Sequence, residues 1–250
     1  WGYTDTFKLT SGSNIGISGS DNADYMVAQS NGGYLNGNDG NDTLVGSSGN
    51  NQLRGDSGND VFYSSSIGYH QIDGGDDIDT VSYIKATSGV SVSLATSSSQ
   101  AVGSGYDSLS SIEHLIGSNY ADTLTGNSSA NRLDGGLMND KLFGSSGNDT
   151  LLGGSGNDTL IGGSGMDSLT GGTGSDIFDF NSLSEMTISG STTDVISDFT
   201  HGTDKIDLST LDANTTTTTN DTFAATFVSS FTQAGQLMYS NGVLYGNTDG

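Results

Sequence analysis

Residues 144–179 read, in groups of nine, GSSGNDTLL GGSGNDTLI GGSGMDSLT GGTGSDIFD. Each group opens with glycine and has aspartate at its sixth position and an apolar residue at its eighth. The six glycine-rich residues favour a turn, because glycine takes up positive φ without a steric cost. The three residues that follow predict a short strand with one side chain facing inward. Two groups therefore close a coil of eighteen residues, and parallel stacking of the coils places Asp158 between Asp140 and Asp176.

The same spacing of apolar residues extends over most of the chain. It runs through Ile17, Met26, Leu35, Leu44, Leu53 and Phe62 and, after one extra residue, Ile72 and Val81. It resumes with Leu115, Leu124, Leu133, Leu142, Leu151, Leu160, Leu169 and Phe178. Between 83 and 114 the period is broken. Two stacks with narrow apolar cores are therefore expected.

The composition limits the choice of partners. The formal net charge is -23, from 29 acidic side chains against 6 lysines and arginines, which argues against nucleic acid as a partner. No apolar run is long enough for a membrane helix, so membrane insertion is not expected. With 39 glycines and 32% hydrophobic residues, the chain without cations lies close to the composition of disordered proteins. Cysteine is absent, which excludes disulfides and thiolate metal sites.

The group pattern GGxGxDxUx, where U is apolar, resembles the nonapeptide of the RTX, or haemolysin-type calcium-binding, family. The resemblance implies an all-β protein built from two right-handed parallel β-rolls, with calcium in the turns. Residues 193–211, TDVISDFTHGTDKIDLSTL, read as two strands joined by a turn. They resemble the segment after the repeats in serralysin-type proteases and other type I secretion substrates. Further strands at 223–231, 235–240 and 243–245 predict an antiparallel C-terminal β cap.

These patterns divide the chain into five segments. Residues 1–11 are expected to end a longer upstream region, 12–82 to form the first roll and 115–180 the second. Residues 83–114 form a connecting insert, in which 90–94 alternate like a half-buried strand. A plain connecting hairpin and an insert with an added function are equally compatible with this segment. Residues 181–250 form the cap, which is expected to continue beyond the last residue.

Calcium fits the chemistry of the turns, because it takes six to eight hard oxygen ligands in a flexible geometry. Each turn offers backbone carbonyls and one carboxylate, whereas zinc would require histidine or cysteine. The candidate carboxylates are Asp24, Asp42, Asp60, Asp79, Glu113, Asp122, Asp140, Asp149, Asp158, Asp167 and Asp176; for Glu113, in the sequence SIEH, this role is implied by the family resemblance. The candidate glycines are Gly37, Gly40, Gly55, Gly58, Gly74, Gly144, Gly147, Gly153, Gly154, Gly156, Gly162, Gly163, Gly165, Gly171, Gly172 and Gly174.

The spacing also assigns each sixth position to one of two edges. In the first roll one edge carries Asp24, Asp42, Asp60 and Asp79, and the other carries Gly33, Asn51 and Tyr69, where no ion is expected. In the second roll one edge carries Asp122, Asp140, Asp158 and Asp176, and the other carries Glu113, Asn131, Asp149 and Asp167. Pairing acids on neighbouring coils predicts about seven calcium ions. Tyr120, Met138 and Asp77 replace the fourth-position glycine, and a positive φ is costly for residues other than glycine. Asn131 replaces a sixth-position aspartate. The turns around Tyr120, Met138 and Asn131 are therefore degenerate.

The sequence supports a calcium-dependent folding and export module of a secreted bacterial protein that uses the type I secretion machinery. An extracellular or cell-surface location follows. The alternatives are a segment of a surface layer or large adhesin, with contacts to the layer or to cell-surface polysaccharide, and the non-catalytic C-terminal region of a serralysin-like protease or alginate epimerase. Neither H-E-x-x-H nor G-x-S-x-G occurs, so no enzymatic activity of its own is expected.

Overall fold

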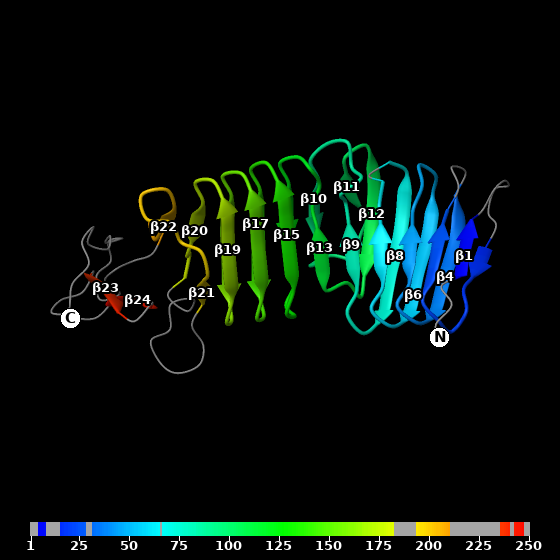
Figure 1. The fold of residues 1–250 in the computed structure, drawn as a ribbon, viewed down its shortest axis with the longest axis horizontal. Helices are drawn as coiled ribbons and strands as arrows, with labels where there is room; N and C mark the ends of the chain where they lie inside the picture. The colour runs from blue at the N-terminus through cyan, green and yellow to red at the C-terminus, as the bar shows by residue number, and fades with distance from the viewer. Residues whose placement is uncertain are drawn as a thin grey trace.

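A computed structural model describes residues 5–8, 16–28, 32–65, 67–182, 194–210, 236–240 and 243–247. These residues form strands and turns. No helix capable of crossing a bilayer is found among them. The strands lie side by side along one axis, from β1 near one end to β22 near the other (Figure 1). The expected all-β parallel solenoid is thereby confirmed.

Register confirms the coil length predicted from the sequence. Met26 aligns with Leu44, eighteen residues later, and Leu133 aligns with Leu151 in the same way. Alternate strands of the chain therefore belong to the same sheet, as expected when two strands and two turns make one coil. The eighth-position residues from Met26 to Phe178 are all buried, so the narrow core consists of inward ladders of Leu, Ile, Val, Met and Phe.

One side of the solenoid is a single ten-stranded sheet, called here the long sheet. Its strands, in spatial order, are β1 (Asp5–Lys8), β3 (Asp24–Val27), β5 (Thr43–Val45), β7 (Val61–Tyr63), β9 (Thr80–Ser82), β13 (His114–Ile116), β15 (Arg132–Leu137), β17 (Thr150–Ser155), β19 (Ser168–Thr173) and β21 (Val195–Ile196). Val81 of β9 aligns with Leu115 of β13, across the 34 residues that contain the insert. The two expected rolls are therefore joined through one uninterrupted sheet.

The opposite side is divided into two six-stranded sheets. The first short sheet contains β11 (Gln100–Val102), β12 (Gly105–Ser110), β8 (Tyr69–Asp76), β6 (Asn51–Ser57), β4 (Gly33–Asp39) and β2 (Gly16–Ser18). The second short sheet contains β10 (Ser91–Ser93), β14 (Thr123–Thr125), β16 (Lys141–Ser146), β18 (Thr159–Ser164), β20 (Ile177–Asp179) and β22 (Lys205–Asp207). The segment 83–114 accounts for this division, because β11 and β12 end one sheet while β10 begins the other.

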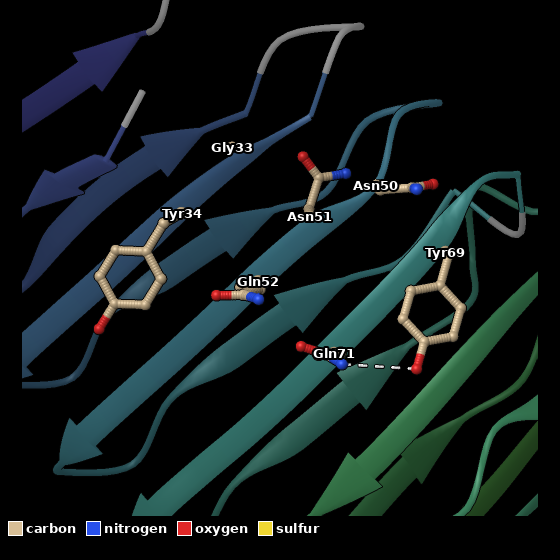
Figure 2. Close-up of a pocket in the computed structure, with 7 residues that line it drawn as sticks. All are labelled: Gly33, Tyr34, Asn50, Asn51, Gln52, Tyr69 and Gln71. Atoms are coloured by element: carbon tan, nitrogen blue, oxygen red, sulfur yellow. Dashed lines mark hydrogen bonds between the residues drawn. The ribbon is translucent and has the colours of Figure 1, made fainter. Parts of the chain in front are cut away.

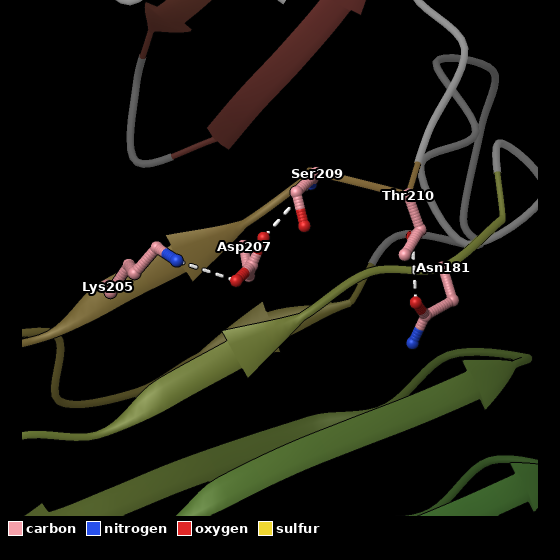
Figure 3. Close-up of polar contacts among 5 residues, drawn as sticks. All are labelled: Asn181, Lys205, Asp207, Ser209 and Thr210. Atoms are coloured by element: carbon pink, nitrogen blue, oxygen red, sulfur yellow. Dashed lines mark hydrogen bonds and ion pairs between the residues drawn. The ribbon is translucent and has the colours of Figure 1, made fainter. Parts of the chain in front are cut away.

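The strands expected in 193–211 are present as β21 and β22, but they lie in different sheets. Each pairs in parallel with the last repeat of its own side, so together they extend the solenoid by about one coil. Figure 3 shows the polar contacts around β22: Lys205 pairs with Asp207 of the same strand at 2.6 Å, and Thr210, just after the strand, donates to Asn181 at 2.7 Å. The antiparallel pair β23 (Gln236–Ser240) and β24 (Val243–Asn247) agrees with the predicted cap strands. The strand expected at 223–231 lies outside the described residues.

Candidate calcium sites in the turns

The sixth-position aspartates sit in turns at the start of strands, and from Asp42 onward their carboxylates link one coil to the next. The backbone N–H of Asp42 donates to Oδ1 of Asp60 at 2.7 Å, and the N–H of Asp140 donates to Oδ1 of Asp158 at 2.8 Å. The same bond joins Asp24 to Asp42, Asp60 to Asp79, Asp122 to Asp140, Asp149 to Asp167 and Asp158 to Asp176. A ladder of carboxylates one coil apart therefore follows each acidic edge.

The second carboxylate oxygen of most of these residues is buried and accepts no hydrogen bond. This holds for Oδ2 of Asp42, Asp60, Asp79, Asp140, Asp149, Asp158, Asp167 and Asp176. A buried ionised oxygen without a partner is costly, so each of these positions requires either a proton or a cation.

The first glycine of each turn leaves the space beside this oxygen empty. A Cβ added to Gly153 would lie 2.5 Å from Oδ2 of Asp158 and 2.5 Å from the carbonyl oxygen of Gly171 on the next coil. Gly37 faces Asp42 and the carbonyl of Gly55 in the same way. The cradle thus combines a carboxylate oxygen and a carbonyl oxygen from two coils, which is the hard-oxygen chemistry that calcium prefers.

The fourth position of most turns takes up positive φ, as expected for a glycine position. Gly156 has φ of 144°, and a Cβ there would collide with the carbonyl of Met138. Met138 and Asp77 also adopt positive φ, at 72° and 77°, so these turns keep the repeat conformation despite the strain. Tyr120 avoids positive φ, as do Asn22 and Ser129 at the same position, so these three turns depart from the repeat conformation.

Burial raises the pKa of six turn aspartates strongly, and repulsion from nearby carboxylates adds to the rise. The pKa of Asp60, Asp79, Asp140 and Asp149 rises to about 7, and that of Asp42 and Asp158 to about 6. The N–H bond along the ladder opposes this shift but does not cancel it. These carboxylates need a positive charge to remain ionised inside the protein at neutral pH.

The residues present fit calcium and do not fit a metal held by side chains alone. No cluster of three His, Cys, Asp or Glu side chains suited to a metal ion occurs in the described part of the chain. An ion in these turns would instead use one carboxylate oxygen per turn together with backbone carbonyls.

Two predicted ligands differ from the others. Oδ2 of Asp24 accepts the N–H of Ser20 at 2.6 Å, and Oδ2 of Asp122 accepts the N–H of Ser118 at 2.5 Å. Both serines occupy the second position of their turn. The oxygen that is free of hydrogen bonds in the other turns is therefore occupied at these two positions.

The acidic edge of the first roll continues directly into the second. The N–H of Asp79 donates to Oε2 of Glu113 at 2.9 Å, and Asn131 Nδ2 donates to the carbonyl of Glu113 at 3.2 Å. Glu113 thus connects Asp79 to the edge that carries Asn131, Asp149 and Asp167. The sequence placed these residues on separate rolls.

The other edge of the first roll carries a buried polar network. His70, and not the predicted Tyr69, aligns with Asn51, because the extra residue lies before position 70. Asn51 Nδ2 lies 3.1 Å from Nδ1 of His70, Asp107 aligns with His70, and Tyr83 donates to Asp107 at 2.9 Å. Burial lowers the pKa of His70 and raises that of Asp107. A network of Asn51, His70, Asp107 and Tyr83, with a single carboxyl group, therefore replaces the carboxylate ladder at this edge.

Sequence reasoning missed three aspartates that follow the last repeat. The N–H of Asp167 donates to Oδ1 of Asp194 at 2.9 Å, and the N–H of Asp176 donates to Oδ1 of Asp204 at 3.1 Å. Asp198 accepts the N–H groups of Gly171 and Gly172. The signal was available, since Asp194 and Asp204 each stand two residues before an inward apolar residue, as Asp167 does.

Comparison with known proteins gives two family matches. Residues 104–243, more than half of the chain, match the family described as peptidase M10 serralysin C terminal. Residues 36–66 match the RTX calcium-binding nonapeptide repeat. No curated protein matches the chain. The solution structure of the AlgE6R3 subunit of the Azotobacter vinelandii mannuronan C5-epimerase is similar at 30% identity, over 47% of this chain and 68% of that one, with a TM-score of 0.34.

Proposed function

The chain belongs to the family of peptidase M10 serralysin C-terminal domains and carries RTX calcium-binding repeats, and from this premise we propose that it is the calcium-folded module of a secreted bacterial protein. The chain stays unfolded at the low calcium concentration of the cytosol and leaves through a type I secretion system. It folds outside the cell, where calcium at about 10⁻⁴ to 10⁻³ M suffices for sites of extracellular type.

The observation that carries this proposal is the row of buried Oδ2 atoms without hydrogen-bond partners along both acidic edges. Bound calcium compensates the negative charge of these buried carboxylate oxygens. Asp42, Asp60 and Asp79 hold it in the first half, and Asp140, Asp158, Asp176, Asp149 and Asp167 in the second. The first-position glycines keep the space open, and their carbonyls contribute further oxygens. Without Asp24 and Asp122, five pairs of stacked repeat aspartates remain. Glu113 and Asp194 each add one further pair, so about seven ions are assigned to the chain.

Circular dichroism with and without calcium tests the proposal. In excess chelator the chain should be largely disordered, because carboxylates about 5 Å apart repel one another along the edges. Millimolar calcium should produce β-structure, whereas magnesium should not replace it, since magnesium demands a tight octahedral shell. A β-spectrum that survives chelation unchanged would contradict the proposal.

We also propose that the module has no catalytic activity and serves as the non-catalytic C-terminal region of its parent protein. The family match supports this, because RTX repeats and serralysin C-terminal domains are non-catalytic regions. Protease, lipase and polysaccharide-lyase assays on the calcium-loaded chain should give no turnover. Turnover abolished by one substitution outside the turns would overturn this assignment.

A further inference from the structure

The outer face of the first short sheet carries three tyrosines and two glutamines that no calcium turn uses. Tyr34 on β4, Gln52 on β6 and Gln71 on β8 lie in one register row, and Tyr69 aligns with Tyr106 on β12. Tyr34 is 36% exposed and Tyr106 is 55% exposed. We call these five residues the tyrosine–amide platform.

The platform is hollowed. A depression of about 430 Å³ is lined by Tyr34, Gln52, Tyr69 and Gln71, and a second of about 300 Å³ continues past Gln71 to Ser108. Figure 2 shows Tyr34 at one side of the first depression and Tyr69 at the other, with Gln52 and Gln71 between them. Gln71 Nε2 donates to the Tyr69 hydroxyl at 3.5 Å, which helps to hold both side chains in place.

The five platform side chains carry no charge, although the chain as a whole has a net charge of -23. The charged residues that line the second depression are Arg54 and Asp73, and Asp73 accepts a hydrogen bond from Ser110 at 2.9 Å. The nearby guanidinium of Arg54 is paired with Asp56 and is not available to attract an anion. A polyanion would be repelled by the molecule, and a polycation would favour the acidic edges instead. The exposed amides would be left without hydrogen-bond partners under an aliphatic ligand.

A neutral sugar polymer matches this chemistry. The apolar C–H face of a pyranose ring packs on a tyrosine ring, which presents a large, rigid apolar surface with a polar tip. Glutamine amides both donate to and accept from sugar hydroxyls. From β4 to β12 there are three steps between strands, about 14 Å, so the platform accommodates a short run of sugar rings.

Among the described residues, the opposite face of the coils has no such arrangement. Tyr25 on the long sheet is 38% exposed, close to the value for Tyr34, but its row continues through Thr43 and Val61. A tyrosine alone is therefore common to both faces, and the combination with amides is specific to the platform. Tyr25 supplies a matched control.

We propose that the tyrosine–amide platform binds a neutral polysaccharide, whose sugar rings cross β4, β6, β8 and β12 along the axis of the solenoid. Binding requires the folded solenoid but does not depend on the number of ions in the turns. Its failure would therefore leave the calcium-folding proposal intact.

Native affinity electrophoresis in saturating calcium tests the proposal. The gels contain hydroxyethyl cellulose, xyloglucan or galactomannan as neutral polymers, and carboxymethyl cellulose as the anionic counterpart. The chain should be retarded in at least one neutral gel and not in the anionic gel. Tyr34→Ala and Gln71→Ala should each weaken the apparent affinity about tenfold, while Tyr34→Phe should retain most of it.

Tyr25→Ala is the control, and it should be retarded as strongly as the unmodified chain. Circular dichroism in calcium verifies that every variant is folded, as expected for exposed positions. The proposal is overturned if no neutral polymer retards the chain or if only carboxymethyl cellulose does. Equal losses in Tyr34→Ala and Tyr25→Ala would also overturn it.

Discussion

Most aspartates of the repeat turns, Asp24 and Asp122 excepted, divide their two carboxylate oxygens between two roles. Oδ1 of Asp158 accepts the N–H of Asp140 and thereby fixes the stacking of two coils. Oδ2 is buried beside Gly153 without a hydrogen-bond partner and is the oxygen assigned to calcium. The two roles can be separated by substitution.

Asp158→Asn should lower the number of bound calcium ions and cost about 1–3 kcal/mol of stability in saturating calcium. The amide oxygen can still accept the N–H of Asp140, but the charged oxygen beside Gly153 is replaced by an NH₂ group. Isothermal titration and thermal melting in calcium provide the two readouts. Asp39→Asn removes the same charge from an exposed third position and should leave both unchanged. Equal effects of the two substitutions would contradict the assignment.

Acid should partly replace calcium in supporting the fold. Asp60, Asp79, Asp140 and Asp149 have a folded-state pKa of about 7 without calcium, against 3.8 for the unconstrained side chain. A raised pKa stabilises the fold below the unfolded value and loses that contribution as pH rises through about 7. The lowered pKa of His70 acts in the opposite direction, but it is one group against several carboxylates.

The calcium-free chain should therefore gain β-structure when the pH is lowered from 8 to 5. Circular dichroism in metal-free buffer at the two pH values measures this. At pH 8 the calcium-loaded chain is the folded reference. A calcium-free spectrum that is equally disordered at both pH values would refute the expected linkage.

At the scale of elements, β21 and β22 extend the coils beyond the last glycine repeat. Asp194 continues the ladder of the long sheet after Asp167, whereas Asp207 of β22 is paired with Lys205. The hydrogen bond from Lys205 lowers the pKa of Asp207 to about 2. The two aspartates therefore differ in role although they are near in sequence.

Asp194→Asn should reduce calcium binding and destabilise the C-terminal end of the solenoid, because a charge is lost from the end of the ladder. The matched variant Asp207→Asn should leave the calcium stoichiometry unchanged. Calcium titration distinguishes them, and hydrogen exchange of β19 locates the loss. An unchanged stoichiometry in Asp194→Asn would exclude this residue as a ligand.

The sequence predicted the elements wherever the period of nine is intact. The inward ladder and the burial of residues such as Leu151 and Leu160 follow from the spacing alone. It did not predict that β9 pairs with β13, because this contact crosses a non-repetitive insert and depends on tertiary packing. The position of the extra residue near His70 was also ambiguous, since the surrounding serines and glycine fit either register. Asp194 was missed because its turn lacks the glycine motif.

For the whole molecule, the continuous long sheet should make folding a single event. In a stack of repeats, the free energy of unfolding is the sum of the stability of each coil and of each interface between neighbouring coils. One weak interface can therefore let the two parts of the stack unfold separately. Glu113 occupies such an interface, since it accepts the N–H of Asp79 and contacts Asn131.

Glu113→Ala should convert one calcium-dependent melting transition into two, because the halves lose their link along the acidic edge. Glu113→Gln can still accept the N–H of Asp79, so it should melt in one transition at a higher calcium requirement. Differential scanning calorimetry across a calcium series resolves the number of transitions. A single unchanged transition in Glu113→Ala would mean that the sheet alone couples the halves.

The network of Asn51, His70, Asp107 and Tyr83 gives the two halves unequal behaviour when calcium is scarce. The four side chains of this network are buried, and none of them is assigned to calcium. Chelation therefore removes bound cations from only one edge of the N-terminal half. The C-terminal half has acidic ladders on both edges, so chelation removes the cations from both edges at once. When calcium is added back, we therefore expect the coils around His70 to become ordered at a lower calcium concentration than the C-terminal half, because only one of their two edges needs ions.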